Sequence, residues 1–327
     1  MWKEPLTEAS FPSVQADLQS LTEAGCDLVR FAVPDTSTAD LLGKLARSSR
    51  MPLSADIHFD YRIALRCLDH PIAKIRLNPG NIGEPWKVEE VVRKARDAGV
   101  GLRIGVNAGS LPRELAGRPD QAAAMVEAAE GELGILEKLG FRDVVFSLKS
   151  SNVETTIEAN LLFSRLHDHP VHLGVTEAGP LVPGIVKNSI GIATLLRQGV
   201  GDTIRVSLSA SAAEEVWAGN EILRTLGLRS LGVNIVSCPH CGRSSFDVQG
   251  FLHDASFLIH HTGKPMTVAV MGCVVNGPSE ARHADLGITG AGSMAIIFRH
   301  GQTVRQVPFG EAVSAFEEEF AKACAQG

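Results

Sequence analysis

Three of the six cysteines lie close together in the last third of the chain, where their spacing suits a metal centre. Cys238 and Cys241 belong to a Cys-Pro-His-Cys sequence, and Cys273 follows in Met-Gly-Cys-Val-Val-Asn-Gly-Pro-Ser-Glu. Three thiolates need a fourth ligand to close a site around a metal. A zinc ion completed by His240 or Cys324 and an iron–sulfur cluster are both compatible with this spacing.

A carboxylate is another way to complete the same site. Glu280 ends the segment that contains Cys273, and the tight Asn-Gly-Pro turn between them returns it toward the metal. A carboxylate ligand would hold one iron weakly and leave it open to an oxygen atom of a substrate. This pattern is typical of a catalytic rather than a structural metal centre.

A second group of polar residues interrupts short runs that otherwise predict buried parallel strands, which should be apolar throughout. Because side chains alternate along a strand, each set shares one face, and most lie near the C-terminal strand ends where barrel enzymes keep their active sites. Five of these residues are cations: Arg30, Arg76, Arg103, Lys149 and Arg205. The uncharged or weakly basic residues on the same faces include His58, Asn78, Asn107 and Ser207.

The charge balance of these faces favours an anionic ligand. Five separate ion pairs at strand ends would be the purely structural explanation, but only Asp56 and Glu177 are carboxylates near the cations. Buried cations are costly to keep without a counter-ion. Arginine forks and a lysine suit a polyphosphate, so the pattern predicts a pocket for a diphosphorylated substrate.

One acidic residue is well placed for proton transfer. Glu177 lies in Val-Thr-Glu-Ala-Gly, directly after the strand expected at 171–176, which makes it the candidate acid or base. Pairing with one of the arginines is the structural alternative. His58 and His172 are weaker candidates, because a single histidine on a strand is more often a hydrogen-bonded core residue.

The elements that must position these residues alternate between short apolar strands and amphipathic helices. Strands are expected at 27–33, 52–58, 74–78, 101–107, 144–149, 171–176 and 203–208. Helical patterns between them include 86–98, 121–139, 153–168 and 185–198, mostly closed by a glycine. Such alternation predicts parallel strands, and the length favours a TIM-type (β/α)8 barrel over 1–228.

The sequence changes character beyond about residue 229. Apolar runs at 231–237 and 267–275 carry the three clustered cysteines, and a Gly-rich stretch follows at 287–293. A further strand is expected at 294–298 and a helix at 310–325. We therefore predict a second, smaller α/β domain over 229–327 that holds the metal centre.

Composition excludes several classes of protein. The 327 residues are 44% hydrophobic and 21% charged, as in a soluble globular protein, and the net charge of −6 argues against nucleic-acid binding. The longest run without a charged residue is 265–279, which glycines and a proline interrupt, so no membrane span is expected. Without a recognisable signal peptide the chain is expected to be cytoplasmic, where cysteines do not form a disulfide framework.

Five motifs together carry a resemblance to a known family. They are Asp56-Ile-His-Phe-Asp-Tyr-Arg-Ile-Ala-Leu65, Lys74-Ile-Arg-Leu-Asn-Pro-Gly-Asn-Ile-Gly83, Gly174-Val-Thr-Glu-Ala178, Ser237-Cys-Pro-His-Cys-Gly-Arg243 and Met271-Gly-Cys-Val-Val-Asn-Gly-Pro-Ser-Glu-Ala281. In this order they resemble the bacterial 4-hydroxy-3-methylbut-2-enyl diphosphate synthases of the methylerythritol phosphate route to isoprenoids. The resemblance extends from about residue 14 to residue 310.

The resemblance implies an iron–sulfur oxidoreductase. It implies a [4Fe–4S] cluster bound by Cys238, Cys241, Cys273 and Glu280. The substrate would be 2-C-methyl-D-erythritol 2,4-cyclodiphosphate, opened and dehydroxylated with two electrons from a flavodoxin or ferredoxin. The family's diphosphate-binding positions fall on Arg30, Arg76, Arg103, Lys149, Arg205 and Ser207, and its barrel carboxylate falls on Glu177.

Two features depart from the family pattern. Ser279 replaces the glycine of the usual Gly-Pro-Gly-Glu sequence. Only seven barrel strands are visible, so the barrel either lacks its first strand or builds it from residues 1–10. The alternative functions are a barrel lyase or aldolase with a structural zinc ribbon, and an inactive diphosphate-binding protein.

The direction of the chain predicts a homodimer. The helix expected at 212–227 returns from the mouth of the barrel to its opposite end, and only residues near 228–232 remain as a linker. A two-fold dimer would let each cluster domain cover the barrel of its partner. The resemblance implies the same arrangement, in which Glu177 and Glu280 of one site belong to different chains.

Overall fold

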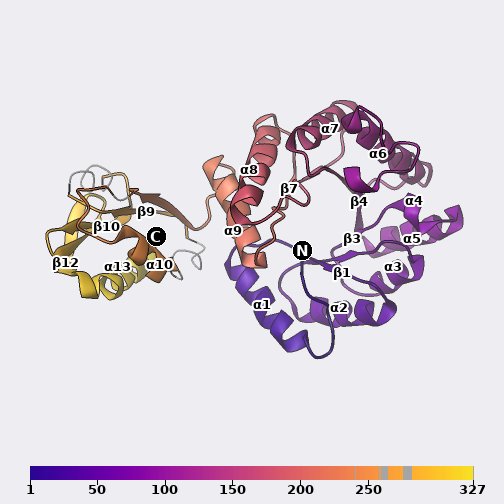
Figure 1. Ribbon diagram of the computed structural model, residues 1–327. Coiled ribbons are helices and arrows are strands. Elements are labelled where there is room, and N and C mark those ends of the chain that lie inside the picture. The colour runs from indigo at the N-terminus through magenta and orange to yellow at the C-terminus, as the bar shows by residue number, and fades with distance from the viewer. Residues whose placement is uncertain (240, 257, 259–263, 275–281, 327) are drawn as a thin grey trace. The chain divides into compact units, whose positions relative to one another are not determined.

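The structure is a computed structural model and describes residues 1–239, 241–256, 258, 264–274 and 282–326 (Figure 1). The chain divides into two compact units, Met1–Ile222 and Leu223–Gly327. This division falls within helix α9 (Ala212–Thr225), ahead of the boundary expected at 228. No helix in the described part of the chain is long and apolar enough to cross a membrane.

The N-terminal unit is a TIM-type barrel, as the alternation of strands and helices predicts. Its strands are β1 (Val29–Ala32), β2 (Leu53–Asp56), β3 (Lys74–Arg76), β4 (Gly101–Asn107), β5 (Val144–Lys149), β6 (His172–Leu173) and β7 (Thr203–Ile204). Strands β1 to β5 pair in parallel in chain order, β6 pairs in parallel with β7, and a parallel bridge between Phe146 and Val171 connects the two groups. The short ladders are buried on both faces, so their apolar side chains form the core.

Helices surround this ring of strands (Figure 1). They are α1 (Phe11–Glu23), α2 (Thr36–Ser48), α3 (Tyr61–Cys67), α4 (Pro79–Ile82), α5 (Pro85–Ala98), α6 (Gln121–Lys138), α7 (Val153–Leu166), α8 (Leu181–Arg197) and α9. Side chains cap the N-termini of several of these helices. Asp35 accepts a hydrogen bond from the Thr38 N–H in α2, and Asn152 accepts one from the Thr155 N–H in α7. Gly99 ends α5 in the left-handed conformation, with φ of 64°.

The first residues of the chain lie between the two ends of the barrel sheet. The Trp2 N–H donates to the Arg30 carbonyl oxygen of β1 at 2.8 Å, and the Lys3 Nζ donates to the Leu208 carbonyl oxygen at 2.9 Å, beyond β7. The Trp2 ring stacks on Phe31, with ring centroids 5.6 Å apart. Residues 1–10, all of which are described, contain no strand, so the alternative in which these residues build a first barrel strand is not observed.

The ladder of β6 and β7 is shorter than the strands expected at 171–176 and 203–208. Gly174, directly after β6, has a φ of +153°, and the carbonyl oxygen of Arg205 occupies the position that a Cβ of residue 174 would take. Glycine is required there because a side chain would collide with the neighbouring backbone. The segments that follow β6 and β7 stay in close contact beyond the ladder. The Arg205 N–H donates to the Leu173 carbonyl oxygen at 2.9 Å.

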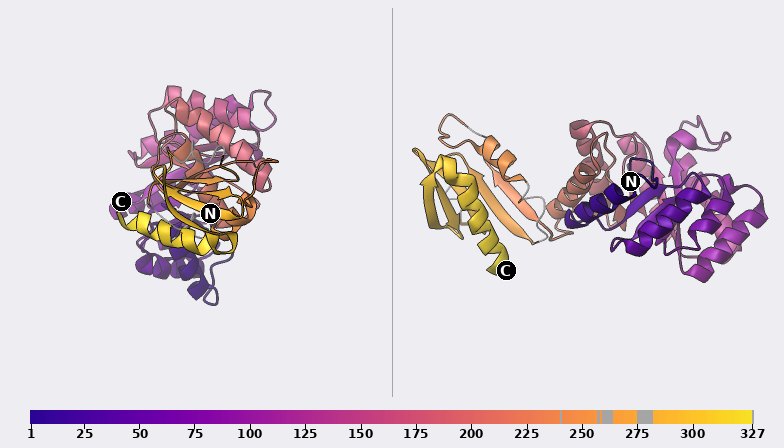
Figure 2. Two further views of the ribbon diagram at one scale, coloured as in Figure 1. Left: turned by 90° about the vertical axis from the view of Figure 1, so that its left-hand side faces the viewer. Right: turned by 90° about the horizontal axis from the view of Figure 1, so that it is seen from below.

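The C-terminal unit is a separate mixed sheet with helices. Its strands are β8 (Val233–Ser237), β9 (Met266–Met271), β10 (Leu286–Ala291), β11 (Met294–Arg299) and β12 (Gln302–Pro308), in the order β12-β11-β10-β9-β8. Strands β8, β9 and β10 are parallel, whereas β11 and β12 are antiparallel to their neighbours. Helices α10 (Val248–Asp254) and α13 (Ala312–Gln326) lie against the sheet (Figure 2). In the core between them, Phe251 and Phe316 meet edge to face.

Two strands of this unit differ from the sequence-based expectation. The Gly-rich stretch at 287–293 is mostly strand β10, because aromatic residues fill the space beside its glycines: Phe298 lies against Gly287, and Phe246 against Gly290. Strand β12 was not expected because it is the last strand in the sheet order and is exposed at most positions, and it therefore lacks an apolar pattern.

Candidate active site

A carboxylate between two arginines forms the centre of the charged residues in the barrel. Asp56, Arg76 and Arg103 are register partners on the adjacent strands β2, β3 and β4. Asp56 is only 5% exposed, and its Oδ1 lies 3.2 Å from the Arg76 Nη1 while its Oδ2 lies 3.4 Å from the Arg30 Nε. The arrangement neutralises one positive charge and orients two guanidinium groups.

Gly105 makes room for the guanidinium of Arg76. The Arg76 Nε lies 2.7 Å from the position that a Cβ of Gly105 would take, so any side chain at 105 would displace the guanidinium. Asn78 engages both backbone groups of the same residue: its Nδ2 donates to the Gly105 carbonyl oxygen at 2.7 Å and its Oδ1 accepts from the Gly105 N–H at 2.9 Å. The Asn78 amide therefore ties the segment after β3 to β4.

Lys149 ends strand β5 opposite Asn107 of β4. Its Nζ lies 3.2 Å from the position that a Cβ of Gly174 would take. Burial, with smaller contributions from the positive charges of Arg103 and Arg205, lowers the pKa of Lys149 well below its usual value. The lowered lysine pKa means that the surrounding side chains supply too little negative charge to stabilise the ammonium.

Several buried nitrogen atoms around Lys149 have no hydrogen-bond partner. Among the described residues these include the Nε atoms of Arg103 and Arg205 and the Nε2 of His172. Burial and the charge of Arg30 lower the pKa of Arg103. Buried donors without acceptors are costly, and they are expected where an anion binds.

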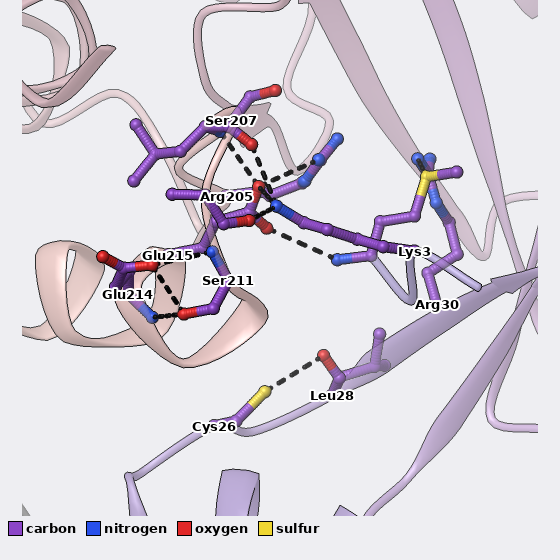
Figure 3. Close-up of polar contacts among 12 residues, drawn as sticks. Lys3, Cys26, Leu28, Arg30, Arg205, Ser207, Ser211, Glu214 and Glu215 are labelled. Atoms are coloured by element: carbon purple, nitrogen blue, oxygen red, sulfur yellow. Dashed lines mark hydrogen bonds and ion pairs between the residues drawn. The ribbon is translucent and has the colours of Figure 1, made fainter. Parts of the chain in front are cut away.

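A second buried carboxylate, Glu215 in the first turn of α9, was missed by the sequence reasoning. It is 6% exposed, its Oε1 accepts from the Leu208 N–H at 2.9 Å, and the same oxygen lies 3.5 Å from the Arg205 Nη2 (Figure 3). One signal was available: Ser211 and Glu214 cap each other at the start of α9, which places Glu215 in the first turn of that helix, shortly after β7. Asp56 and Glu177 are therefore not the only carboxylates near the cations.

The other predicted residues of the barrel are more exposed. Glu177 follows β6, is exposed and has a φ of 52°, a left-handed conformation that costs energy for a residue with a side chain. His58 is 54% exposed, with its Nδ1 3.4 Å from the Arg76 Nη1. Ser207 is half-buried beyond β7, and its carbonyl oxygen accepts from Asn188 at 3.4 Å.

Within the described part of the chain, only one ring nitrogen of His172 in β6 has the hydrogen bond that is typical of a core histidine. Its Nδ1 lies 2.8 Å from the Thr203 Oγ1, and burial followed by the charge of Lys149 lowers its pKa well below the usual value. The imidazole is therefore neutral near pH 7. It supplies a polar atom without adding a further positive charge to the site.

Two of the predicted metal ligands lie at the ends of neighbouring strands in the C-terminal unit. Cys238 follows β8 and Cys273 follows shortly after β9, its parallel neighbour. The Gly272 N–H donates to the Cys238 Sγ at 3.1 Å, and the Thr289 Oγ1 donates to the Cys273 carbonyl oxygen at 2.9 Å. Cys241 is exposed, and a hydrogen bond from the Arg243 backbone lowers the pKa of its thiol.

These loops fit a thiolate-bound metal group. N–H groups directed at sulfur and a lowered thiol pKa both stabilise thiolate, which is the form that binds metals. A side chain at Gly272 would meet the Ser244 Oγ and lie 3.4 Å from the Cys238 Sγ, so glycine permits the close approach. No group of metal-binding side chains is assembled within the described residues, and the predicted ligand Glu280 and the alternative ligand His240 lie outside them.

Comparison with known proteins gives consistent matches along the chain. Residues 6–220 match the family model described as the GcpE TIM-barrel domain, and residues 234–322 match the GcpE protein C-terminal domain. A 4-hydroxy-3-methylbut-2-en-1-yl diphosphate synthase (flavodoxin) from Treponema denticola is 50% identical, over 94% of this chain and 85% of that protein. Proteins with the same name from Treponema pallidum and Geobacter sulfurreducens are 52% and 48% identical over 94% of this chain, covering 79% and 88% of their own lengths.

Proposed function

The chain belongs to the GcpE family, and on this basis we propose that it converts 2-C-methyl-D-erythritol 2,4-cyclodiphosphate to (E)-4-hydroxy-3-methylbut-2-enyl diphosphate. Counted on the fully protonated acids, the reaction takes up two electrons and two protons. One C–O bond that closes the cyclic diphosphate breaks, and one hydroxyl group leaves as water. Such a reaction needs a site for a diphosphate, a proton donor and a source of single electrons.

The observation that carries this proposal is the excess of buried positive charge in the barrel. The diphosphate would bind to the described cations, which are Arg30, Arg76, Arg103, Lys149 and Arg205. Asp56 holds two of these arginines in place, while the unpartnered Nε–H groups of Arg103 and Arg205 are free to donate to phosphate oxygens. A bound diphosphate would supply the missing acceptors and the missing negative charge together.

The uncharged residues would orient the substrate. Asn107 and Ser207 would donate hydrogen bonds to it, and His58 would extend the donor set from the exposed side of Arg76. Asn78 would act through the backbone of Gly105, to which its amide is bound. Glu177 would transfer a proton to the leaving hydroxyl, and its left-handed backbone would hold the carboxylate in an exposed position for this step.

The loops of the C-terminal unit would bind a [4Fe–4S] cluster through Cys238, Cys241, Cys273 and Glu280. When bound, such a cluster supplies single electrons and an iron with affinity for a substrate oxygen. The Gly272 N–H, directed at the Cys238 Sγ, would stabilise negative charge on that sulfur. Since the relatives are named as flavodoxin enzymes, a flavodoxin is the proposed electron donor, with a ferredoxin as the other candidate.

The proposal assigns residues 1–228 to substrate binding and residues 229–327 to the cluster. It includes a cytoplasmic homodimer in which Glu177 and Glu280 of one active site come from different chains. The support is the chain direction: α9 follows β7 directly, and only a short connection leads from α9 to β8. A barrel lyase with a zinc ribbon is not favoured, because the matched relatives are named as the diphosphate synthase.

Metal analysis after anaerobic purification tests the proposal. We expect a brown protein that absorbs near 400 nm, with about four iron and four sulfide per chain. Cys273→Ser should lose this absorbance, whereas Cys67→Ser, at a buried thiol in α3, should keep it. A colourless wild-type protein with one zinc per chain and no iron would overturn the proposal.

A further inference from the structure

After Asp56, Glu215 is the least exposed carboxylate of the barrel. It lies where the segment after β7, helix α9 and the first residues of the chain meet. Its Oε1 accepts from the Leu208 N–H at 2.9 Å and lies 3.2 Å from the Lys3 Nζ and 3.5 Å from the Arg205 Nη2 (Figure 3). A buried charge with this many partners is held in one position.

Lys3 extends the contact to the other end of the barrel sheet. Its Nζ also donates to the carbonyl oxygens of Leu208 and Ala210, while the neighbouring Trp2 N–H binds the carbonyl oxygen of Arg30 on β1. Glu215 and Lys3 thereby connect the segment after β7 to β1. These two places carry Arg205 and Arg30, both proposed to bind the diphosphate.

The contact with Glu215 uses one end of the Arg205 guanidinium. The carboxylate lies beside Nη2, whereas the Nε is buried and has no partner within the described residues. The Arg205 side chain is 27% exposed, so part of it faces solvent rather than neighbouring side chains. Among the described residues, Glu215 is the one charged group that forms an ion pair with Arg205.

We propose that Glu215 is a positioning residue that holds Arg205 with its Nε–H directed to the diphosphate and sets its spacing from Arg30 through Lys3. The inference rests on the proposed function. It assigns a role in substrate affinity to a carboxylate that does not itself contact the substrate.

The proposal predicts that Glu215→Gln changes anion affinity in the direction opposite to that expected from the loss of a negative charge alone. If Glu215 only reduced the positive charge of the site, Glu215→Gln would tighten anion binding, because one negative charge would be lost beside the anion. If it positions Arg205, the same change should weaken binding by about tenfold to a hundredfold, the range of one lost charge-assisted hydrogen bond.

Calorimetric titration of the full chain with inorganic pyrophosphate shows whether the substitution raises or lowers the affinity. Glu214→Gln is the matched control: it removes the same charge one residue away, and glutamine can still cap α9. We expect weaker binding for Glu215→Gln and nearly unchanged binding for Glu214→Gln. Tighter binding for Glu215→Gln would overturn the proposal.

A double-mutant cycle with Arg205→Gln shows whether Glu215 acts through this arginine. Once Arg205 is removed, Glu215→Gln should weaken pyrophosphate binding no further, and losses that add would refute the assigned role. In the holoenzyme, Glu215→Gln should raise KM for the cyclic diphosphate several-fold more than it lowers kcat.

Two further measurements separate the possible failures. If Glu215→Gln does not fold, Glu215→Asp keeps the charge but withdraws the carboxylate from Arg205, and it should also weaken binding. Wild-type affinity in Glu215→Asp would show a purely structural carboxylate and refute the inference. If the wild type binds no pyrophosphate, the proposed function fails first and the inference fails with it.

Discussion

Protonation of a single residue, Lys149, should be linked to anion binding in the barrel. Burial lowers the pKa of Lys149, and a bound anion would raise it again because opposite charge favours the ammonium form. Binding of pyrophosphate should therefore take up protons. Affinity should be highest below the lowered pKa of the free protein and should fall as the pH rises from there toward the raised pKa of the complex. Titrations in two buffers of different ionisation enthalpy should give different apparent enthalpies. Lys149→Arg, whose guanidinium stays protonated, should lose this part of the difference. Equal proton uptake in both proteins would contradict the prediction.

At the scale of an element, the turn after β9 depends on one glycine. A Cβ at Gly272 would collide with Ser244 and approach the Cys238 Sγ, whereas a Cβ at Gly242, in the loop that also contains Cys241, has no atom within 4 Å. Gly272→Ala should lower the free energy of unfolding by about 1–3 kcal/mol, as overpacking does, and reduce the iron bound per chain. Gly242→Ala should change neither quantity. Thermal unfolding and iron analysis check this, and wild-type values for Gly272→Ala would show that the turn tolerates a side chain.

At the scale of the whole molecule, the proposed dimer can be tested by complementation. Glu177→Gln and Cys273→Ser chains should each be inactive, because one lacks the proton donor and the other a cluster ligand. Mixed dimers should regain up to one competent site, since both defects would fall in the same composite site and leave the other intact. Differently tagged chains, co-expressed and purified through both tags, provide the sample for the activity measurement. Inactive mixed dimers, or a fully active wild-type monomer, would refute the cross-chain site.

Local patterns in the sequence were enough to predict the barrel and the second domain, and they select the cations proposed to bind the substrate. Period-two alternation assigns Arg76 and Arg103 to strands, and their observed register on β3 and β4 makes them neighbours. The Cys-Pro-His-Cys motif likewise marks the loop after β8. These features repeat over a few residues, so they can be recognised without knowing which distant segments meet.

Other features depend on contacts between segments far apart in the chain, and only the tertiary structure decides them. Lys3 binds the segment after β7 across some two hundred residues, and Glu215 becomes a buried partner of Arg205 only when the barrel brings its ends together. Gly287 belongs to a strand because Phe298 lies against it. In each case the energy comes from burial and pairing with a distant partner, and such a partner leaves no local pattern in the sequence.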